Sequence, residues 1–401
     1  MADWEVKTLG EVCLIERGGS PRPIQKYLTD DENGINWIKI GDTKNVTKYI
    51  YETRQKIIHD GIKRSRMVNI GDFILSNSMS FGKPYIMKTS GCIHDGWLVL
   101  RENKKLIDKD YLYYLLSSHI IYKQFDNLAT GSTVRNLNIQ LVKKVKISFP
   151  TSIEEQKRIV KILDSTFEKI DKSIENTRKN LKNSKEVFES YLNDVFSSNK
   201  NCKTEILENL TEIITKGSSP RWQGINYVQE PELLFITSKN VGEGKLIMKK
   251  KQYLEIKFND TQKRSILKYG DVLTNIVGAS IGRTAIYNLN ELANINQAVC
   301  ILRCINSKLS NSYLMNLLNS PYLKKILHDN EVDGARANLS LTFFKNLEIP
   351  LPTLLEQEKI VKQLDTLSEK TKMLEGIYSS KLIDLEDLKK SVLEQAFSGK
   401  L

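Results

Sequence analysis

The sequence predicts an α+β protein in which two similar mixed α/β globular domains are joined by two long antiparallel helices that form a coiled coil, pseudo-twofold within the chain. Three observations predict this fold class. The chain of 401 residues matches itself at an offset of about 200 residues. Each copy mixes short β-rich segments with helical periodicity. Each copy also ends in a long stretch whose apolar residues recur every seven positions.

The internal repeat keeps its order along the whole chain, so it reflects one structural unit that occurs twice. The clearest matches are GGSPR (18–22) with GSSPR (217–221), GDFILSNSMSFGK (71–83) with GDVLTNIVGASIGR (270–283), EEQKRIVKILD (154–164) with LEQEKIVKQLD (355–365), and YLNDVFSS (191–198) with VLEQAFSG (392–399). We therefore expect a first globular domain over 1–150, a first helix over 151–200, a second globular domain over 201–352 and a second helix over 353–401.

Within each copy, short segments rich in β-branched and aromatic residues predict strands. In the first copy these are residues 37–40, 73–76 and 97–101, and one helix with Leu112, Leu115, Leu116 and Ile120 on a single face interrupts them. The last strand alternates apolar and polar residues, as a strand with one buried face does. Its apolar positions are Val145, Ile147 and Phe149 in the first copy and Leu347, Ile349 and Leu351 in the second.

Each long helical stretch follows a proline and opens with an S/T-x-x-E capping box, at residues 152–155 and 353–356. Its length of about 45 residues corresponds to roughly 65 Å. Because so narrow an apolar stripe needs a partner, we expect the two helices to pair antiparallel and to hold the globular domains at opposite ends of a rod. The expected seam of the second helix includes Ile360, Leu364, Leu367, Leu374, Tyr378, Leu385, Leu388 and Val392.

Composition limits the class of protein. The formal net charge of +12 gives a field that attracts polyanions, of which nucleic acid is the most common, although a lysine-rich, A·T-biased genome yields a similar surface without such a partner. Five cysteines without a C-x-x-C pair argue against a disulfide framework and a standard zinc site. No apolar run approaches the roughly 20 residues of a membrane span, and no signal peptide follows Met1. We expect a cytoplasmic protein.

Several segments resemble the DNA specificity subunit of type I restriction-modification systems. They are GGSPR, GDVLTNIVGASIGRTAI (270–286), NQAVCILR (296–303), NLSLTFFKNLEIPLPTLLEQEKIV (338–361) and LEQAFSGKL (393–401). The resemblance extends over both halves of the chain. It agrees with the twofold repeat, because a molecule with two readers suits a duplex whose accessible groove recurs about every 34 to 36 Å.

The resemblance implies two target recognition domains, a bipartite site in double-stranded DNA, and assembly with two methyltransferase subunits and with restriction subunits that translocate and cleave DNA. This chain would then catalyse nothing and bind no cofactor or metal of its own. S-adenosylmethionine would belong to the methyltransferase subunits, and ATP and Mg to the restriction subunits. Since HDGW (94–97) stands where the second half has NQAV (296–299), we expect the two domains to read different sequences.

Motif absences agree with a chain that is not an enzyme. The sequence has no G-x-x-x-x-G-K-[ST] loop and no N-P-P-[FY] or D-P-P-Y tetrapeptide. The His94-Asp95 pair suggests a base and its orienting group, but the matching positions hold Asn296 and Gln297. The E-x-K tripeptide at Glu255 is the remaining candidate for a metal-dependent nuclease, and it has no counterpart in the first half.

Loops that combine small residues with Arg, Lys, Asn and Ser are the best candidates for DNA contact, because such loops allow close backbone approach and can reach phosphates or base edges. The candidates in the first half are Ser20, Arg22, Asn77, Lys83, Thr133 and Arg135. Those in the second half are Ser219, Arg221, Lys239, Asn275, Arg283, Arg336 and Asn338. For the Ser-Pro-Arg loops an ordinary turn is the alternative.

Two other functions stay open at this point. One is a self-contained nuclease or methyltransferase that carries its own recognition domains, and turnover by the pure chain would identify it. The other is a coiled-coil adaptor that coats DNA without sequence preference, with an affinity set by salt and duplex length alone.

Overall fold

The computed structural model describes residues 3–44, 46–77, 81–102, 104–129, 136–198, 203–331 and 337–401. The chain divides into two compact units. Unit 1 comprises residues 1–177 and 380–401, and unit 2 comprises residues 178–379. Each unit therefore contains one globular part together with a portion of each long helix. The domain bounds expected from the sequence stay a prediction.

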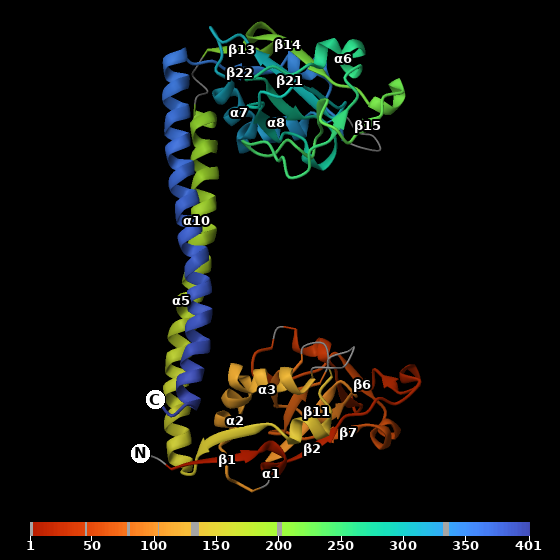
Figure 1. Ribbon diagram of the computed structural model, residues 1–401, viewed down its shortest axis with the longest axis vertical. Helices are drawn as coiled ribbons and strands as arrows, with labels where there is room; N and C mark the ends of the chain where they lie inside the picture. Colours follow the sequence, from red (N-terminus) through yellow and green to blue (C-terminus); the bar gives the residue numbers. More distant parts are fainter. Residues whose placement is uncertain are drawn as a thin grey trace. The chain divides into compact units, whose positions relative to one another are not determined.

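The globular part of unit 1 is built on a five-stranded main sheet in the order β2-β11-β8-β9-β5. Its central strand β11 (Trp97–Glu102) pairs antiparallel with β2 (Cys13–Arg17) and with β8 (Phe73–Ser76). The remaining strands are β9 (Pro84–Met87) and β5 (Tyr49–Ile50), and the second sheet contains β3 (Leu28–Thr29), β6 (Gln55–Ile57), β4 (Ile35–Ile38), β10 (Gly91–Ile93) and β7 (Arg66–Val68) in that order. A ribbon of β1 (Trp4–Thr8) and β12 (Lys146–Pro150) completes the strands (Figure 1).

Alternation along the strands divides the core of unit 1 into two layers. Phe73 and Leu75 of β8 pack with Leu112 of α2 (Lys109–Ser117), whereas Ile74 packs with Ile38 of the second sheet. The main sheet therefore lies between a helical layer and the second sheet. The other short helices of this unit are α1 (Leu9–Val12), α3 (His119–Ala129) and α4 (Ile139–Lys143).

The globular part of unit 2 repeats this plan with shorter sheets. Its main sheet has the order β14 (Thr211–Lys216), β21 (Val299–Cys304), β18 (Val272–Asn275) and β19 (Thr284–Ile286). Its second sheet has the order β15 (Tyr227–Val228), β17 (Tyr253–Leu254), β16 (Leu233–Ile236) and β20 (Ala293–Ile295), and β13 (Thr204–Ile206) pairs with β22 (Glu348–Pro350). The helices are α6 (Phe258–Thr261), α7 (Asn311–Asn319), α8 (Pro321–Asp329) and α9 (Leu341–Lys345).

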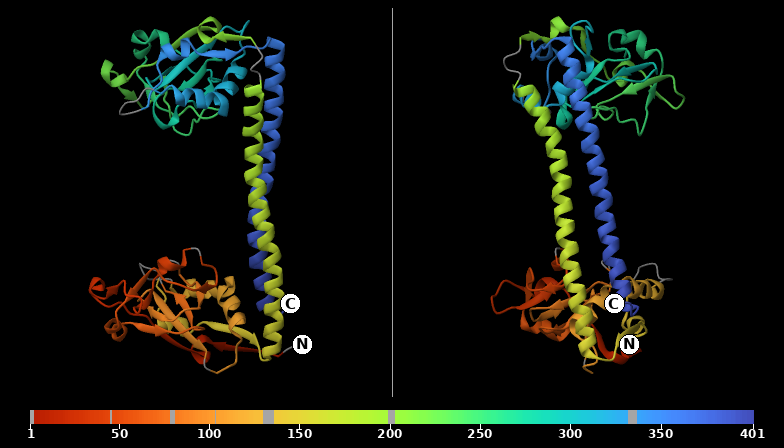
Figure 2. Two further views of the ribbon diagram at one scale, coloured as in Figure 1. Left: turned by 180° about the vertical axis from the view of Figure 1, so that it is seen from behind. Right: turned by 90° about the vertical axis from the view of Figure 1, so that its left-hand side faces the viewer.

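The long helices α5 (Ile153–Ser198) and α10 (Leu354–Phe397) pair within each unit. In unit 1 the beginning of α5 shares a core with the end of α10, through Leu163 and Phe397 among others. In unit 2 the end of α5 shares a core with the beginning of α10, through Leu192 and Leu364. Both pairings are therefore antiparallel (Figures 1 and 2). The predicted fold class is confirmed in its elements: two similar mixed α/β globular parts and two long antiparallel helices.

A buried glutamine in each repeated helix opening joins the helix to its globular part. Gln156 is fully buried; its Oε1 accepts from the Asp108 N–H at 2.7 Å, and its Nε2 donates to the carbonyls of Leu106 and Pro150. Gln357 forms the same three bonds in unit 2. Because a side-chain amide offers both acceptor and donors, it satisfies three buried backbone groups at once. This is a physical reason for the repeated opening of the two helices.

The far ends of the helices are also duplicated. The ring of Phe397, at the end of α10, lies edge-on to Tyr111 in unit 1, with 5.3 Å between ring centroids. The ring of Phe196, at the end of α5, lies 5.4 Å from Tyr313 in unit 2. All four rings are nearly or fully buried. Each globular part therefore receives the beginning of one helix and the end of the other.

Some sequence predictions at element boundaries were wrong. The single helix expected around residues 112–120 is two helices, because Ser118 has an extended ψ of 151° and its hydroxyl accepts from the Ile121 N–H. Ile120 is consequently 36% exposed. The strand expected over 37–40 ends at Ile38, since a 3₁₀ turn begins at Ile40. In the second helix Leu374 and Leu388 are 41% and 46% exposed and lie beside the seam.

The two capping boxes also differ. At the start of α10, Thr353 and Glu356 form both reciprocal bonds, from the Thr353 N–H to the carboxylate at 2.9 Å and from the Glu356 N–H to the hydroxyl at 3.4 Å. At the start of α5, the Ser152 hydroxyl accepts from the Glu155 N–H at 3.3 Å, but the Glu155 carboxylate pairs with Arg158 instead. The second box is therefore complete and the first is half formed.

Candidate nucleic-acid interface

One edge of each main sheet gathers the loops that carry the sequence-predicted contact residues. In unit 1, β2 and β8 end at this edge and β11 begins there, because Arg17 is opposite Leu98 and Ser76 is opposite Trp97. In unit 2, β14 and β18 end and β21 begins at the corresponding edge. Loops that leave neighbouring strands at one edge are neighbours in space. We call this edge, with its loops, the loop edge of each unit.

Hydrogen bonds tie the loops of unit 1 together at the loop edge. The Ser20 hydroxyl donates to the Asp95 carboxylate at 2.6 Å, and the Asn77 side-chain amide donates to the Asp95 carbonyl at 2.9 Å. The Leu137 N–H donates to the Asn77 carbonyl at 2.9 Å. Four segments that are far apart in the sequence, around residues 20, 77, 95 and 137, thus meet in one cluster.

Unit 2 forms a related cluster, in which the corresponding asparagine has a different partner. The Asn275 amide donates to the Ser238 carbonyl at 2.9 Å, which joins the end of β18 to the loop after β16. Val277 forms an isolated β-bridge with Asn338, and the Leu339 N–H donates to the Ile276 carbonyl at 2.9 Å. The loop edge is therefore an element of the duplicated fold.

A glycine is required where each Ser-Pro-Arg loop leaves its strand. A Cβ atom on Gly18 would lie 2.1 Å from the His94 carbonyl oxygen, and one on Gly217 would lie 1.8 Å from the Ile295 carbonyl oxygen. No side chain fits at such distances from the backbone. The repeated glycine thus brings the Ser-Pro-Arg loop against the second sheet in both units.

Most of the predicted contact residues in the described segments are accessible at the loop edge. Ser20 and Ser219 are half-buried, and the exposed candidates are Arg22, Lys83, Arg221, Lys239, Arg283 and Asn338. The side chain of Arg22 is 81% exposed, with a guanidinium nitrogen 3.8 Å from the Asp95 carboxylate. Thr133, Arg135 and Arg336 lie outside the described residues.

Two predicted contact residues are buried. Asn77 is 1% exposed and Asn275 is fully buried, and the side-chain amide of each donates to a backbone carbonyl of a neighbouring loop. Their sequence context, a polar residue in a small-residue loop, looks the same as that of a surface contact. Burial corrects this expectation: these two side chains position the loops rather than reach a ligand.

Sequence reasoning missed Trp222, a tryptophan whose side chain is almost fully exposed to solvent. Trp222, directly after Arg221, is 90% exposed, while Trp37 and Trp97 are 2% and 0% exposed. A tryptophan within the turn-forming stretch GSSPRWQG (217–224) was the available signal.

Unit 1 has a hollow of about 700 Å³ beside its Ser-Pro-Arg loop. Pro21, Pro23, Ile24 and Trp37 supply apolar walls, and the polar lining residues are Ser20, Arg22, Lys39 and His94. The hydrogen bond from Ser20 holds the pKa of the adjacent Asp95 below its usual value. Burial lowers the pKa of His94, whose Nε2 and Nδ1 lie 3.1 and 2.6 Å from the N–H nitrogens of Ile40 and Gly96; a neutral ring accepts from one of the two. At neutral pH the lining thus combines a neutral imidazole with the cations Arg22 and Lys39, and the Asp95 carboxylate lies beside Arg22.

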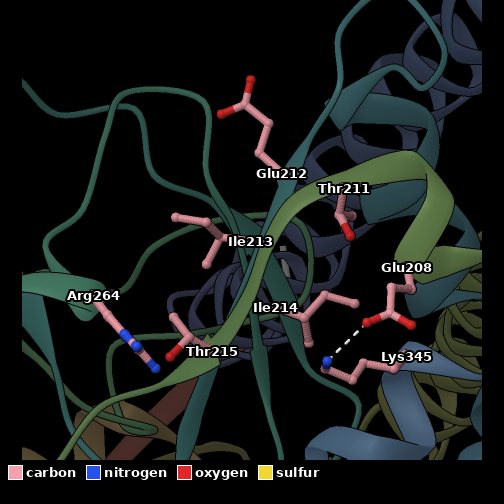
Figure 3. Close-up of a pocket in the computed structure, with 8 residues that line it drawn as sticks. All are labelled: Glu208, Thr211, Glu212, Ile213, Ile214, Thr215, Arg264 and Lys345. Atoms are coloured by element: carbon pink, nitrogen blue, oxygen red, sulfur yellow. Dashed lines mark hydrogen bonds and ion pairs between the residues drawn. The ribbon is translucent and has the colours of Figure 1, made fainter.

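A second hollow, in unit 2, runs along β14 from Thr211 to Thr215 (Figure 3). It measures about 350 Å³, and Glu208, Glu212, Arg264 and Lys345 are among its lining residues. The Lys345 ammonium lies 2.8 Å from the Glu208 carboxylate, so these two charges pair with each other (Figure 3). Two carboxylates in the lining make this surface less suited to a polyanion than the loop edge.

The comparisons with known proteins assign a family. The family model for the type I restriction modification DNA specificity domain matches twice, over residues 1–183 and 185–380. The chain belongs to this specificity family. The two matches together cover most of the chain, and each contains one globular part with its loop edge.

Curated specificity subunits are similar to this chain. The MjaVIII specificity subunit of Methanocaldococcus jannaschii is 24% identical over 100% of this chain and 93% of its own length. The EcoBI specificity subunit of Escherichia coli is 33% identical over 42% of this chain and 35% of its own length. The chain is thus similar over its full length to a type I restriction enzyme specificity subunit.

Solved structures share the fold of this specificity-family chain. One of them comes from a study of the complex assembly and conformational transition of the type I R-M system. Its TM-score is 0.78 at 20% identity, and the alignment covers 100% of both chains. The HsdS subunit of Thermoanaerobacter tengcongensis has a TM-score of 0.65 at 22% identity, with 99% of this chain and 97% of that chain covered.

The candidate catalytic groups of the specificity-family chain have structural partners. Glu255 accepts from the Asn226 N–H at 2.9 Å, the largest reason that its pKa is lowered, and it pairs with Lys257 at 3.1 Å. No cluster of three or more His, Cys, Asp or Glu side chains suited to a metal ion occurs in the segments that the structure describes. Among those same segments, no helix has the length and apolar character needed to cross a bilayer.

Proposed function

We propose that this specificity-family chain is a non-catalytic subunit that gives a type I restriction-modification complex its DNA sequence specificity. Each globular part reads one half of a bipartite site in double-stranded DNA through its loop edge. The paired helices set the spacing between the half-sites and dock two methyltransferase subunits. S-adenosylmethionine binds on those subunits, whereas ATP and Mg bind on the restriction subunits, and no cofactor or metal binds on this chain.

The observation that carries this proposal is the duplicated loop edge with different side chains. Both units build the loop edge on equivalent strands, β2 and β11 in unit 1 and β14 and β21 in unit 2, and both require a glycine there. Unit 1 presents Arg22, His94 and Asp95 there, whereas unit 2 presents Arg221 and Gln297. Arginine suits guanine, a carboxylate accepts from cytosine, and a side-chain amide suits adenine, each as a major-groove contact. One framework with two sets of donors and acceptors fits a site with two different halves.

The exposed side of α10 in unit 2 supports docking of a partner protein on the helices. Leu355, Met373 and Ile377 are 77%, 70% and 48% exposed and fall on one side of the helix at 100° per residue, together with Lys359 and Lys370. An apolar stripe flanked by lysines fits an acidic, amphipathic helix of a methyltransferase subunit. Replacing Met373 and Ile377 with serine should weaken the association measured by solution mass, while Lys372→Ser, at an exposed position about 100° around the helix from Met373, serves as the control.

Binding-site selection with the full chain and its methyltransferase subunits tests the central claim. The wild-type complex should select a bipartite duplex, and Arg22→Ala and Arg283→Ala should each relax preference in a different half-site. Equal loss on every sequence would assign these residues to phosphate contact. Selection of no sequence, with affinity set by salt and duplex length, would favour the non-specific adaptor.

Two further measurements test the finer parts of the proposal. The pure chain incubated with Mg²⁺, S-adenosylmethionine and duplex DNA should neither cleave nor methylate it, and turnover would make the chain an enzyme. Insertion of four residues into one long helix, about one turn and 6 Å, should change the tolerated gap and leave both half-site sequences unchanged. Altered half-site sequences would contradict a spacing role for the helices.

A further inference from the structure

The indole of Trp222 is unusually exposed to solvent for a tryptophan side chain. Its 90% exposure is the highest among the large hydrophobic side chains of the described segments that lie on the surface. An indole in water loses the large gain of burying an aromatic surface, and tryptophan usually gains that energy in a core or at an interface. The other three tryptophans follow this rule, since Trp37 and Trp97 are buried and Trp4 packs partly buried against the core of unit 1.

The turn that carries Trp222 is fixed on its inner side. It is a 3₁₀ turn, η6 (Pro220–Gln223), in which Pro220 is buried. The Gln223 amide donates to the Ser218 hydroxyl at 2.7 Å and accepts from the Thr261 hydroxyl at 2.6 Å. Gly224 ends the turn in the left-handed region, with φ of 66°. Of the four side chains of the turn, those of Pro220 and Gln223 are thus fixed on the inner side, and those of Arg221 and Trp222 are exposed.

The turn also belongs to the loop edge of unit 2. It follows Lys216, the last residue of β14, and Gly217, which packs against the Ile295 carbonyl. The loop over 276–283 leaves β18 at the same edge of the sheet. Arg221 directly precedes Trp222 and Lys216 ends β14 six residues earlier, and both are exposed cations. An exposed aromatic ring on a loop that carries cations suits a polyanion that also has aromatic faces.

Unit 1 has the opposite shape at the same position. There Pro23 follows Arg22 where unit 2 has Trp222 after Arg221, and the apolar surface is the wall of a hollow formed with Trp37. One unit therefore presents an apolar projection and the other an apolar recess on equivalent loops. This difference accounts for different half-sites more directly than charge does, because both loops carry one arginine.

We propose that Trp222 is a stacking residue for DNA: when unit 2 engages its half-site, the indole enters the base stack at one step while Arg221 contacts the neighbouring phosphate. This inference rests on the proposed function and specifies how unit 2 binds. A planar apolar side chain that separates two bases forces a local kink, and flexible pyrimidine–purine steps favour it. Trp222 thus contributes preference for a deformable step without a hydrogen bond to any base.

The experiment uses the full chain with the methyltransferase subunits of its own system and a duplex selected by the wild-type complex. On binding, indole emission should fall, since Trp222 is the one strongly exposed tryptophan among the four. 2-Aminopurine at one position of the half-site, away from the methylated adenine, should brighten with wild type and not with Trp222→Ala. Trp222→Ala should bind about tenfold more weakly, as loss of one aromatic stack predicts, and Trp222→Phe should retain most affinity.

Tyr269→Ala is the matched control. Tyr269 is 71% exposed and precedes β18, at the end of the sheet opposite the loop edge. The Tyr269→Ala variant should bind DNA as the wild type does. Trp222→Ala, Trp222→Phe and Tyr269→Ala should all unfold at the wild-type temperature, because neither Trp222 nor Tyr269 is buried. Loss of DNA affinity in Tyr269→Ala equal to that in Trp222→Ala would overturn the assignment to the loop edge.

The remaining outcomes separate this inference from the proposed function. If the wild-type complex selects a site but shows no change in indole emission and Trp222→Ala binds it equally well, the stacking role is wrong and the specificity role stands. If Trp222→Ala lowers the mass of the complex without DNA, Trp222 is a protein contact and the inference is wrong. If the wild-type complex selects no sequence, the proposed function itself fails.

Discussion

Replacing Gln357 with leucine would remove the three hydrogen bonds that join the beginning of α10 to the globular part of unit 2. The side chain is fully buried, and its partners are the N–H of Ser310 at 2.8 Å and the carbonyls of Lys308 and Pro352 at 3.1 and 3.0 Å. Each bond contributes about 1 kcal/mol net, and a buried backbone group left without a partner costs about 1 to 3 kcal/mol. We expect a loss of about 3 to 5 kcal/mol, because leucine replaces the volume but none of the bonds.

The assay is thermal unfolding combined with amide hydrogen exchange. A loss of 3 kcal/mol in a unit of this size lowers its unfolding temperature by about 6 to 12 °C. Amides near the beginning of α10 should exchange faster in Gln357→Leu, because the helix start is no longer held. Gln156→Leu should do the same to unit 1 and to the beginning of α5, since it loses the equivalent three bonds.

Gln395→Leu is the matched control, because Gln395 lies on the same helix with an exposed side chain. It should change stability by less than about 0.5 kcal/mol, as an ordinary surface substitution does. An equal effect of Gln395→Leu and Gln357→Leu, or a loss below 1 kcal/mol in both buried glutamines, would refute the reasoning that these amides hold the helices to the globular parts.

Three other predictions concern groups inside the two units. Asp271→Asn should destabilise unit 2 by about 3 kcal/mol or more, because it leaves the Arg303 guanidinium, now 2.7 Å from a carboxylate that is 1% exposed, without its charge partner. Glu255→Gln, which breaks a surface pair with Lys257, should destabilise unit 2 far less in the same denaturation assay. Burial lowers the pKa of His94 in the folded chain below its ordinary value near 6.5, so the unfolded chain takes up a proton more readily than the folded chain. The stability that the neutral imidazole contributes should be fully present above about pH 6.5 and be lost as the pH falls through the folded pKa. His94→Asn, which introduces the residue that unit 2 has at this position, should remove this dependence between pH 5 and 8, and an unchanged slope would contradict the prediction. Phe397→Ala should destabilise unit 1 by about 3 to 5 kcal/mol, because it leaves a cavity beside Tyr111, and Phe196→Ala should do the same in unit 2 beside Tyr313. Unchanged unfolding temperatures of both units would show that these rings do not hold the helix ends.

The repeat allowed much of the fold to be predicted because both copies obey the same local physics. Alternation in residues 145–149 and the seven-residue period of the long helices depend on spacing along the chain, which a sequence displays directly. The same is true of the Thr353 capping box. The break at Ser118 escaped prediction, since the apolar face on either side of it continues without a change of period.

The candidate site was predictable only in part. The loops that meet at the loop edge were identified from their small and polar residues, yet Asn77 and Asn275 proved to be buried while Trp222 proved to be exposed. A side chain's exposure depends on which segments pack over it. For Asn275 these are the loop after β16 and the beginning of β21, which come from distant parts of the chain.

The sequence by itself determined the duplication, the mixed α/β class of the globular parts and the two long amphipathic helices, because these follow from periodicity and from order along the chain. Only the tertiary structure decided that Gln156 and Gln357 are buried connectors, that the Ser-Pro-Arg loops share an edge with three other segments, and that the indole of Trp222 faces the solvent. Those properties are set by contacts between residues far apart in sequence, and local pattern carries no record of such contacts.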